Sequence, residues 1–200
     1  MTKIKICGLT RPQDIAYVNE VKPDYIGFIL LFPKSRRNLT PDQAEALRKE
    51  LDPAIRAVGV FVNQPAETVL KAAKSVGLDV IQLHGQEDAA YIREIQSASG
   101  LPVWKAFHIR TPADLEDTAA SPADAVLLDN GYGTGEAFDW TLAESFRRPF
   151  FLAGGLTPDN ISEAVHTLHP ALVDLSSGVE TAGYKDLTKI RAAVKAAHTS

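Results

Sequence analysis

Eight short apolar segments recur along the chain, and each is followed by a stretch with helical character. The apolar segments are rich in β-branched and aromatic residues, which favour strands. Several of them, such as residues 57–62 and 150–153, are almost continuously apolar, as parallel strands buried on both faces usually are. The chain has 200 residues, so each strand–helix unit takes about 25 residues, the compact end of the range for α/β barrels. This alternation predicts an α/β protein built from repeated βα units.

The expected strands cover residues 3–7, 24–31, 55–62, 79–83, 102–107, 123–129, 149–153 and 171–175. Helix-start residues support the segments between them. Thr40 and Pro41 precede a helical pattern at residues 44–51, residues 64–67 precede another at 68–76, and residues 157–160 precede a third at 161–168. A further helix is expected near residues 111–118. An open doubly wound sheet also fits the alternation, but it usually has fewer strands. A closed (βα)₈ TIM barrel, one domain over residues 1–200, is therefore the preferred fold.

Composition narrows the possible partners. The net charge of −4 argues against nucleic acid or an anionic membrane as the main partner. The longest apolar run, residues 26–32, is far below the ~20 residues of a membrane helix. Cys7 is the one cysteine, which excludes an internal disulfide and a multi-thiolate zinc site. The short, charged amino terminus is unlike a signal peptide. We expect a cytoplasmic protein, a monomer or weak homodimer, that binds a small molecule and no metal.

The loops after the last two expected strands are candidates for phosphate binding. In TIM barrels the active site lies at the carboxyl ends of the strands, and phosphate often binds after strands seven and eight. Gly154 and Gly155 follow the seventh expected strand, and Ser176, Ser177 and Gly178 follow the eighth. Glycine lets the backbone approach a ligand closely, and N–H groups at a helix start attract anions. Two tight turns are the alternative, but the positions favour a phosphate site.

Two other loops suit an anionic ligand. Residues 131–135, with Gly133 and Gly135, follow the sixth expected strand and are typical of a loop that closes over a ligand, or of a solvated loop. Lys34, Arg36 and Arg37 form the densest cationic cluster at any strand end. Such clusters are usually solvated. An acidic protein that binds an anion nevertheless needs local cations, and the planar guanidinium of arginine suits a carboxylate.

Cys7 ends the first expected strand. By the period-two alternation of a strand it shares a side with Lys3 and Lys5, whereas Ile4 and Ile6 point to the other side. Lysines would face the apolar helix layer only at high cost, so this side is expected to be the barrel interior. Cys7 is then either an inert core residue or a reactive thiol at the mouth, where nearby cations would favour the thiolate.

Three further polar residues have two possible roles each. Asp129, at the end of the sixth strand, could be a general acid or base, or could cap a turn. Asp174, within the eighth strand, either lines the site or pairs with an interior lysine. His84 could be a ligand or a base, although a polar lining or structural role is preferred. His108 is set aside, because the sequence shows no second histidine at a strand end with carboxylate partners.

Taken together, the motifs resemble phosphoribosylanthranilate isomerases across essentially the whole chain. The similar segments are residues 5–10 (KICGLT), 24–28 (DYIGF), 35–37 (SRR), 58–63 (VGVFVN), 81–85 (IQLHG), 128–129 (LD), 133–135 (GTG), 138–140 (FDW), 152–156 (LAGGL) and 174–180 (DLSSGVE). Each segment alone is weak evidence for the family, but the order and spacing of all of them together are highly specific for it.

The resemblance implies a TIM barrel that catalyses an Amadori rearrangement in tryptophan biosynthesis. It implies that Cys7 is the general base, Asp129 the general acid, and Arg37 the residue that holds the anthranilate carboxylate. The substrate phosphate would lie between the glycine loops at residues 154–155 and 176–178. His84, Gly133, Gly135 and Asp174 would also contact substrate. This chemistry moves only protons, so it implies no metal and no cofactor.

Three alternatives remain open at this point. A metal-dependent pentose-phosphate epimerase would need histidines and carboxylates at several strand ends, where only His84 is well placed. An indole-glycerol-phosphate synthase would need a lysine acid paired with glutamates, and we find no glutamates at the strand ends. A non-catalytic phosphate sensor on the same fold would not need both Cys7 and Asp129.

Overall fold

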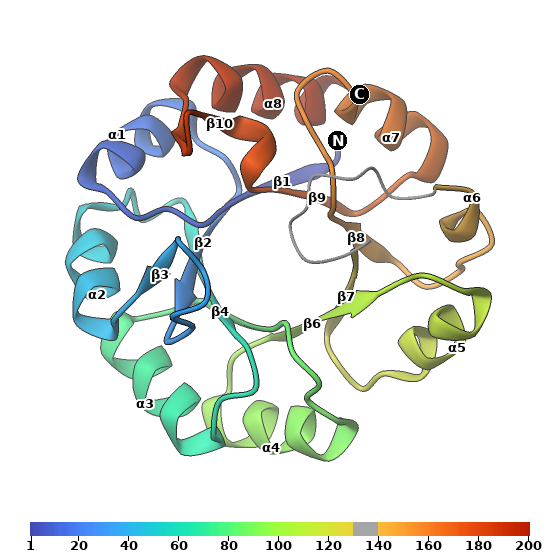
Figure 1. Cartoon of the computed structure of the whole chain (residues 1–200), viewed down its shortest axis with the longest axis horizontal. Helices are drawn as coiled ribbons and strands as arrows, with labels where there is room; N and C mark the ends of the chain where they lie inside the picture. The colour runs from blue at the N-terminus through green and yellow to red at the C-terminus, as the bar shows by residue number, and fades with distance from the viewer. Residues whose placement is uncertain (130–139) are drawn as a thin grey trace.

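The main sheet is a closed barrel of eight parallel strands (Figure 1). The computed structural model describes residues 1–129 and 140–200. The barrel strands are β1 (Lys3–Cys7), β2 (Tyr25–Leu30), β4 (Arg56–Phe61), β5 (Val80–Leu83), β6 (Val103–His108), β7 (Ala125–Asp129), β8 (Phe150–Leu152) and β9 (Leu172–Leu175). Each pairs with the next in that order, and β1 pairs with both β2 and β9, which closes the ring. The prediction of a closed (βα)₈ barrel is confirmed.

Helices form the outer ring (Figure 1). They are α1 (Pro12–Val21), α2 (Pro41–Glu50), α3 (Ala66–Val76), α4 (Ala89–Ser99), α5 (Pro112–Ala120), α6 (Trp140–Ala143), α7 (Ile161–Leu168) and α8 (Leu187–Thr199). The predicted start of α2 is confirmed, because Thr40 and Gln43 exchange side chain-to-backbone hydrogen bonds in a capping box. The helix expected near residues 111–118 is α5.

Three short strands were not predicted. The strand β3 (Asn38–Leu39) pairs in parallel with the carboxyl end of β2. The strands β10 (Glu180–Thr181) and β11 (Tyr184–Lys185) form an antiparallel hairpin after the 3₁₀ helix η1 (Ser177–Val179). The hairpin turn is Ala182–Gly183, and both residues have positive φ angles of 50° and 85°, as a two-residue hairpin turn requires. These elements follow the carboxyl ends of β2 and β9 and therefore border the barrel mouth.

Side chains alternate between the barrel interior and the helix layer. Ile4 and Ile6 of β1 belong to the large apolar cluster that contains the buried helix residues. A separate interior cluster contains Tyr25, Val58, Val80, Trp104 and Leu172. The Trp104 ring contacts the Tyr25 and Phe151 rings edge-on, with centroids 5.0 and 4.7 Å apart, a favourable aromatic geometry. These side chains fill the amino end of the barrel, so the site is confined to the carboxyl end.

Two opposite charges lie buried in the interior. Lys5 Nζ donates a hydrogen bond to Asp174 Oδ2 at 2.7 Å, and Lys5 is 0% exposed. The two residues are directly paired in the β1–β9 register. Asp174 therefore pairs with an interior lysine, one of its two expected roles. Lys5 and Cys7 face the interior, as the alternation predicted. A buried ion pair adds little net stability, but removing one partner leaves an uncompensated buried charge.

We therefore expect Lys5→Met and Asp174→Val each to lower the free energy of unfolding by about 3–5 kcal/mol, because each leaves one buried charge without its partner. The double variant Lys5→Met/Asp174→Val should recover most of that loss. Urea denaturation of the four proteins measures the difference. If the double variant lost the sum of the two single effects, the pair would be a net source of stability and this account of the interior would be wrong.

Candidate active site

Cys7 lies at the carboxyl end of β1 with its thiol in the interior, and it is 8% exposed. Its register partner on β2 is Gly27. A Cβ atom at Gly27 would lie 2.7 Å from Cys7 Sγ and 3.0 Å from Lys5 Cε, so the space for the thiol exists only because residue 27 is glycine. On the other side, Ser176 Oγ donates a hydrogen bond to the Cys7 carbonyl at 3.1 Å. The thiol position is thus fixed from both neighbouring strands.

The electrostatic surroundings of Cys7 contain both cations and a carboxylate. Burial raises the pKa of the Cys7 thiol more than the neighbouring Lys5 ammonium lowers it, and the Asp174 carboxylate raises it further. The prediction that nearby cations favour the thiolate is confirmed, because Lys5 and Lys185 both lower the pKa of the thiol, but burial outweighs them. Lys5 is present as predicted, but Asp174 offsets much of its charge.

Asp129 lies at the carboxyl end of β7, 8% exposed, beside two histidines. His84 Nε2 is 3.1 Å from Asp129 Oδ2. His108, the last residue of β6, is the register partner of Asp129, and the two interact electrostatically. Burial lowers the pKa of His108 more than the Asp129 carboxylate raises it. Setting His108 aside was wrong, because counting by twos from interior Trp104 would have placed His108 in the mouth.

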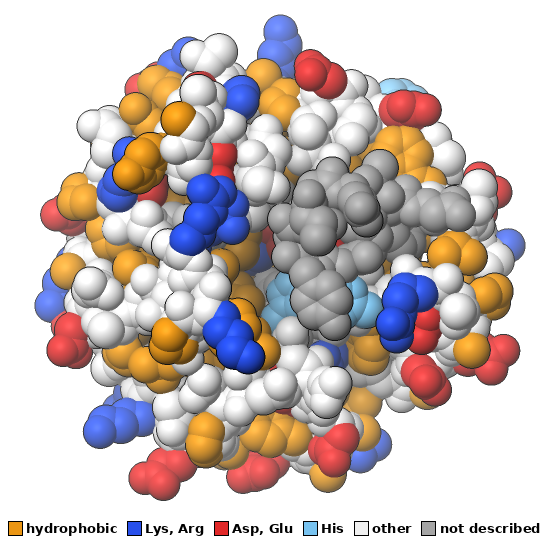
Figure 2. Space-filling model, viewed as in Figure 1, with side chains coloured by type: hydrophobic (Ala, Val, Ile, Leu, Met, Phe, Trp, Pro, Cys, Tyr) orange, Lys and Arg blue, Asp and Glu red, His pale blue; other side chains and the backbone are white. Residues whose placement is uncertain are grey.

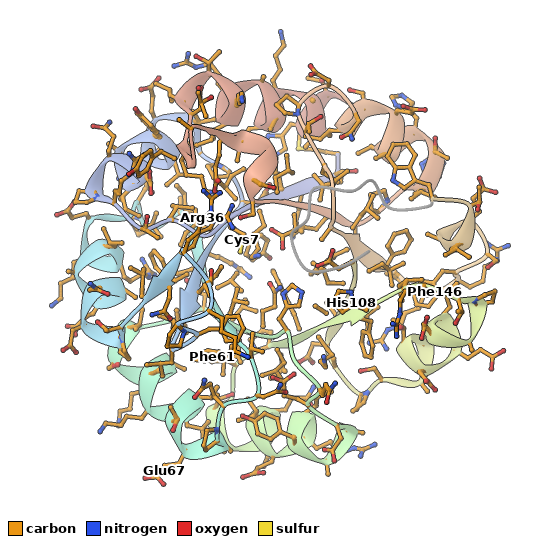
Figure 3. All side chains as sticks on the ribbon, viewed as in Figure 1. Cys7, Arg36, Phe61, Glu67, His108 and Phe146 are labelled. Atoms are coloured by element: carbon orange, nitrogen blue, oxygen red, sulfur yellow. The ribbon has the colours of Figure 1, made fainter. Side chains whose placement is uncertain are left out.

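A third group consists of Arg37, Glu180 and Lys185. Arg37 donates from Nε and Nη2 to the two oxygens of Glu180, at 2.7 and 2.9 Å. Lys185 Nζ donates to Glu180 Oε1 at 2.8 Å. Arg36 also pairs with Glu180, but its side chain is 56% exposed, against 18% for Arg37. Figure 3 shows Arg36 farther from the barrel centre than Cys7.

A cavity of about 220 Å³ lies beside this group. Its lining includes Gly8, Arg36, Arg37, Glu180 and Lys185. Figure 2 views the barrel along its axis and shows Lys and Arg side chains to one side of the centre, with histidine atoms near the centre. Glu180 was not predicted to have a role of its own. A carboxylate two residues after the Ser-Ser-Gly loop was the one signal in the sequence that could have identified it.

The two glycine loops adjoin each other. Gly154 and Gly155 have positive φ angles of 88° and 66°, a conformation that suits glycine. A Cβ atom at Gly178 would lie 1.9 Å from the carbonyl oxygen of Leu156. The loop after β9 therefore packs backbone to backbone against the loop after β8, as a shared anion site needs. The predicted contacts of Gly133 and Gly135 lie outside the described residues.

The barrel brings these groups to one mouth. Cys7, Asp174 and Asp129 belong to β1, β9 and β7, all near the carboxyl end. His84 and Ser176 directly follow β5 and β9. Two Lys–Glu pairs also form near this end, Lys185–Glu180 and Lys105–Glu87, at 2.8 and 3.5 Å. Glu180 begins β10, and Glu87 lies in the loop between β5 and α4, so neither glutamate lies at the end of a barrel strand, where glutamates were expected to be absent.

The described residues contain neither a metal-binding cluster nor a membrane-spanning helix. Over residues 1–129 and 140–200 there is no group of three His, Cys, Asp or Glu side chains arranged to hold a metal ion. Among the helices of the same residues, none is long and apolar enough to cross a membrane.

Comparison with known proteins identifies the family. Residues 4–196 match the model of the N-(5′-phosphoribosyl)anthranilate (PRA) isomerase family. The chain belongs to this family. It is 45% identical to the N-(5′-phosphoribosyl)anthranilate isomerase of Thermoanaerobacter sp. (strain X514), with 98% of this chain and 97% of the relative covered.

Solved structures agree with the assignment to the PRA isomerase family. The phosphoribosyl anthranilate isomerase of Thermus thermophilus superposes with a TM-score of 0.89 at 38% identity, over 99% of each chain. A second phosphoribosyl anthranilate isomerase, solved in complex with reduced 1-(o-carboxyphenylamino)-1-deoxyribulose 5-phosphate, gives a TM-score of 0.86 at 35% identity, over 100% of each chain. Membership of the PRA isomerase family decides against the epimerase and the indole-glycerol-phosphate synthase.

The contact between the glycine loops yields a prediction. Gly178→Ala should weaken binding of inorganic phosphate at least about tenfold, because the new methyl group forces the loops apart and displaces the N–H groups that face the anion. Gly100→Ala is the control for loss of stability alone: a Cβ atom there meets nothing within 4 Å, but the positive φ of 66° strains the backbone at the end of α4. Calorimetric titration with phosphate measures both. Unchanged phosphate affinity in Gly178→Ala would show that the anion does not bind between these loops.

Proposed function

We propose that this protein catalyses the Amadori rearrangement of N-(5′-phosphoribosyl)anthranilate to 1-(o-carboxyphenylamino)-1-deoxyribulose 5-phosphate, a step of tryptophan biosynthesis in the cytoplasm. The observation that carries the proposal is the placement of Cys7 and Asp129 at one barrel mouth, with the Arg37 cluster and the glycine loops around it. A related isomerase binds a reduced form of this product.

Asp129 is the proposed general acid. It donates a proton to the furanose ring oxygen while the C1–O bond breaks, and the nitrogen lone pair forms a protonated Schiff base at C1. His84, 3.1 Å away, supports this role, because an imidazole can hold the carboxyl group in place by a hydrogen bond and pass a proton to it.

Cys7 is the proposed general base. The protonated Schiff base makes the proton on C2 acidic, and the Cys7 thiolate removes it to give an enolamine. Loss of the enol proton and protonation at C1 then give the ketone, so the substrate and product have the same composition. Only protons move, and the reaction needs no metal, no cofactor and no redox step.

The two anionic groups of the substrate have separate proposed partners. The phosphate lies between residues 154–155 and 176–178, and the anthranilate carboxylate binds to Arg37. With both ends of the substrate bound, the reacting carbons C1 and C2 would lie between Asp129 and Cys7. The energy of binding the two anionic groups would then orient these carbons for proton transfer. This arrangement also explains how a chain of net charge −4 holds an anionic substrate.

Separate losses are expected from the acid and the base. Cys7→Ala and Asp129→Asn should each lower kcat by about 10²–10⁴-fold, because each removes one proton transfer, while substrate affinity stays close to that of the wild type. The measurement is fluorescence-monitored turnover of freshly made phosphoribosylanthranilate, with and without a chelator.

The same assay tests the proposal as a whole. Wild-type protein that binds sugar phosphate tightly without turning it over would indicate a sensor and not an enzyme. If Cys7→Ala kept near wild-type turnover, Cys7 would serve only in packing and the mechanism would need another base, with His84 the first candidate.

The two neighbouring arginines should differ in effect. Arg37→Ala should impair turnover roughly 10- to 100-fold, because it removes a charged hydrogen-bond partner of the substrate carboxylate. Arg36→Ala should change turnover far less, since Arg36 is more exposed and lies on the outer side of Glu180. Steady-state kinetics of the two variants show which arginine contributes more to turnover. The reverse order of effects would assign the carboxylate to Arg36.

A further inference from the structure

Glu180 is a buried carboxylate that the proposed reaction does not use. Its side chain is 5% exposed and contacts Arg36, Arg37 and Lys185. Lys185 is also buried and donates a second hydrogen bond to the Ser176 carbonyl at 2.8 Å. Glu180 therefore links the arginine loop after β2 to the serine loop after β9.

The contact with Arg37 uses one particular edge of the guanidinium group. A guanidinium has two edges that can hold a carboxylate in bidentate fashion, one formed by Nε and Nη2 and the other by Nη1 and Nη2. Glu180 accepts from Nε and Nη2. The edge that includes Nη1 is not the one engaged by Glu180, so a second carboxylate can approach Arg37 end-on while Glu180 stays bound.

The stem of Arg37 is fixed as well. A Cβ atom at Gly8 would lie 2.4 Å from Arg37 Cδ, so the arginine stem passes directly over the backbone next to Cys7. The backbone N–H of Arg37 donates a hydrogen bond to Ser35 Oγ at 3.1 Å. With both the stem and the Nε edge held, Arg37 has little rotational freedom left to lose on binding a ligand.

Glu180 stays charged over the whole physiological range. Burial alone would raise the pKa of Glu180, but hydrogen bonds from Arg37 and Lys185 outweigh burial and lower the pKa to about 2. Because this value lies below the pKa of the unfolded chain, the stabilisation is complete above about pH 4.5 and is lost only as the pH falls from there toward 2. The Glu180 carboxylate therefore keeps its hydrogen bonds to Arg37 unchanged near neutral pH.

We propose that Glu180 is a positioning residue of this isomerase: it holds the Nε edge of Arg37 and thereby orients the Nη1 edge to receive the substrate carboxylate. The proposal rests on the proposed function, which supplies the carboxylate that Arg37 binds. The competing explanation is that Glu180 only neutralises buried Lys185, in which case its effect on the reaction does not pass through Arg37.

A double-mutant cycle separates these explanations. Glu180→Gln should raise KM about tenfold with little change in kcat, because binding of a remote group is lost rather than chemistry. In the Arg37→Ala background, Glu180→Gln should cause no further rise in KM. An equal rise in both backgrounds, or no rise in the wild-type background, overturns the proposal. Arg36→Ala is the control on the same carboxylate, and its KM should stay close to that of the wild type.

A binding readout keeps the test independent of turnover. Calorimetric affinity for anthranilate should fall about tenfold in Glu180→Gln, whereas affinity for inorganic phosphate should not change. Absence of wild-type turnover would count against the proposed function alone, whereas a parallel loss of affinity for both probes would count against the role of Glu180. If Glu180→Gln fails to fold, Glu180→Asp keeps the charge for Lys185 but shortens the reach to Arg37. It should give the same loss of anthranilate affinity, and unchanged affinity would overturn the proposal.

Discussion

The pairing of β1 with both β2 and β9 is the constraint on which the site depends. It closes the barrel, and its register sets Lys5 beside Asp174 and Cys7 beside Gly27. A shift of one residue in this register would turn Cys7 and Lys5 toward the apolar helix layer and bring Ile4 and Ile6 inside. The register also brings the loop after β9 next to Cys7, where Ser176 binds the Cys7 carbonyl.

Three buried carboxylates near the mouth have partners of different kinds. Asp174 pairs with Lys5, and Glu180 pairs with Arg37 and Lys185. Asp129 pairs with His84, whose imidazole ring has one nitrogen that can donate a proton and one that can accept it. Carboxylates held by lysine and arginine suit structural and orienting roles. A carboxylate held by an imidazole suits proton transfer. The choice of partner therefore divides three chemically similar groups between architecture and chemistry.

The sequence was sufficient for the barrel and for most of the mouth, because both depend on local patterns. Period-two alternation placed Lys5 and Cys7 inside, and the glycines after the last two strands marked adjoining loops. The short strands β3, β10 and β11 were missed because two residues are too few to show periodicity. Glu180 was missed as a partner of Arg37 because the two are 143 residues apart in sequence. The raised pKa of Cys7 depends on burial and on Asp174, which a linear pattern does not reveal.

The raised pKa of the Cys7 thiol makes the order of proton transfers matter under the proposed mechanism. Burial opposes ionisation of the Cys7 thiol. Transfer of a proton from Asp129 to the ring oxygen creates a cation at C1, one bond from the carbon that Cys7 must deprotonate. An opposite charge nearby lowers the pKa of a thiol, so ring opening by the acid favours release of the Cys7 proton to water at the mouth, and the thiolate that results takes the proton from C2. The Asp174 partner of Lys5 fits this order, because a lysine left unpaired beside Cys7 would stabilise the thiolate before the Schiff base has formed.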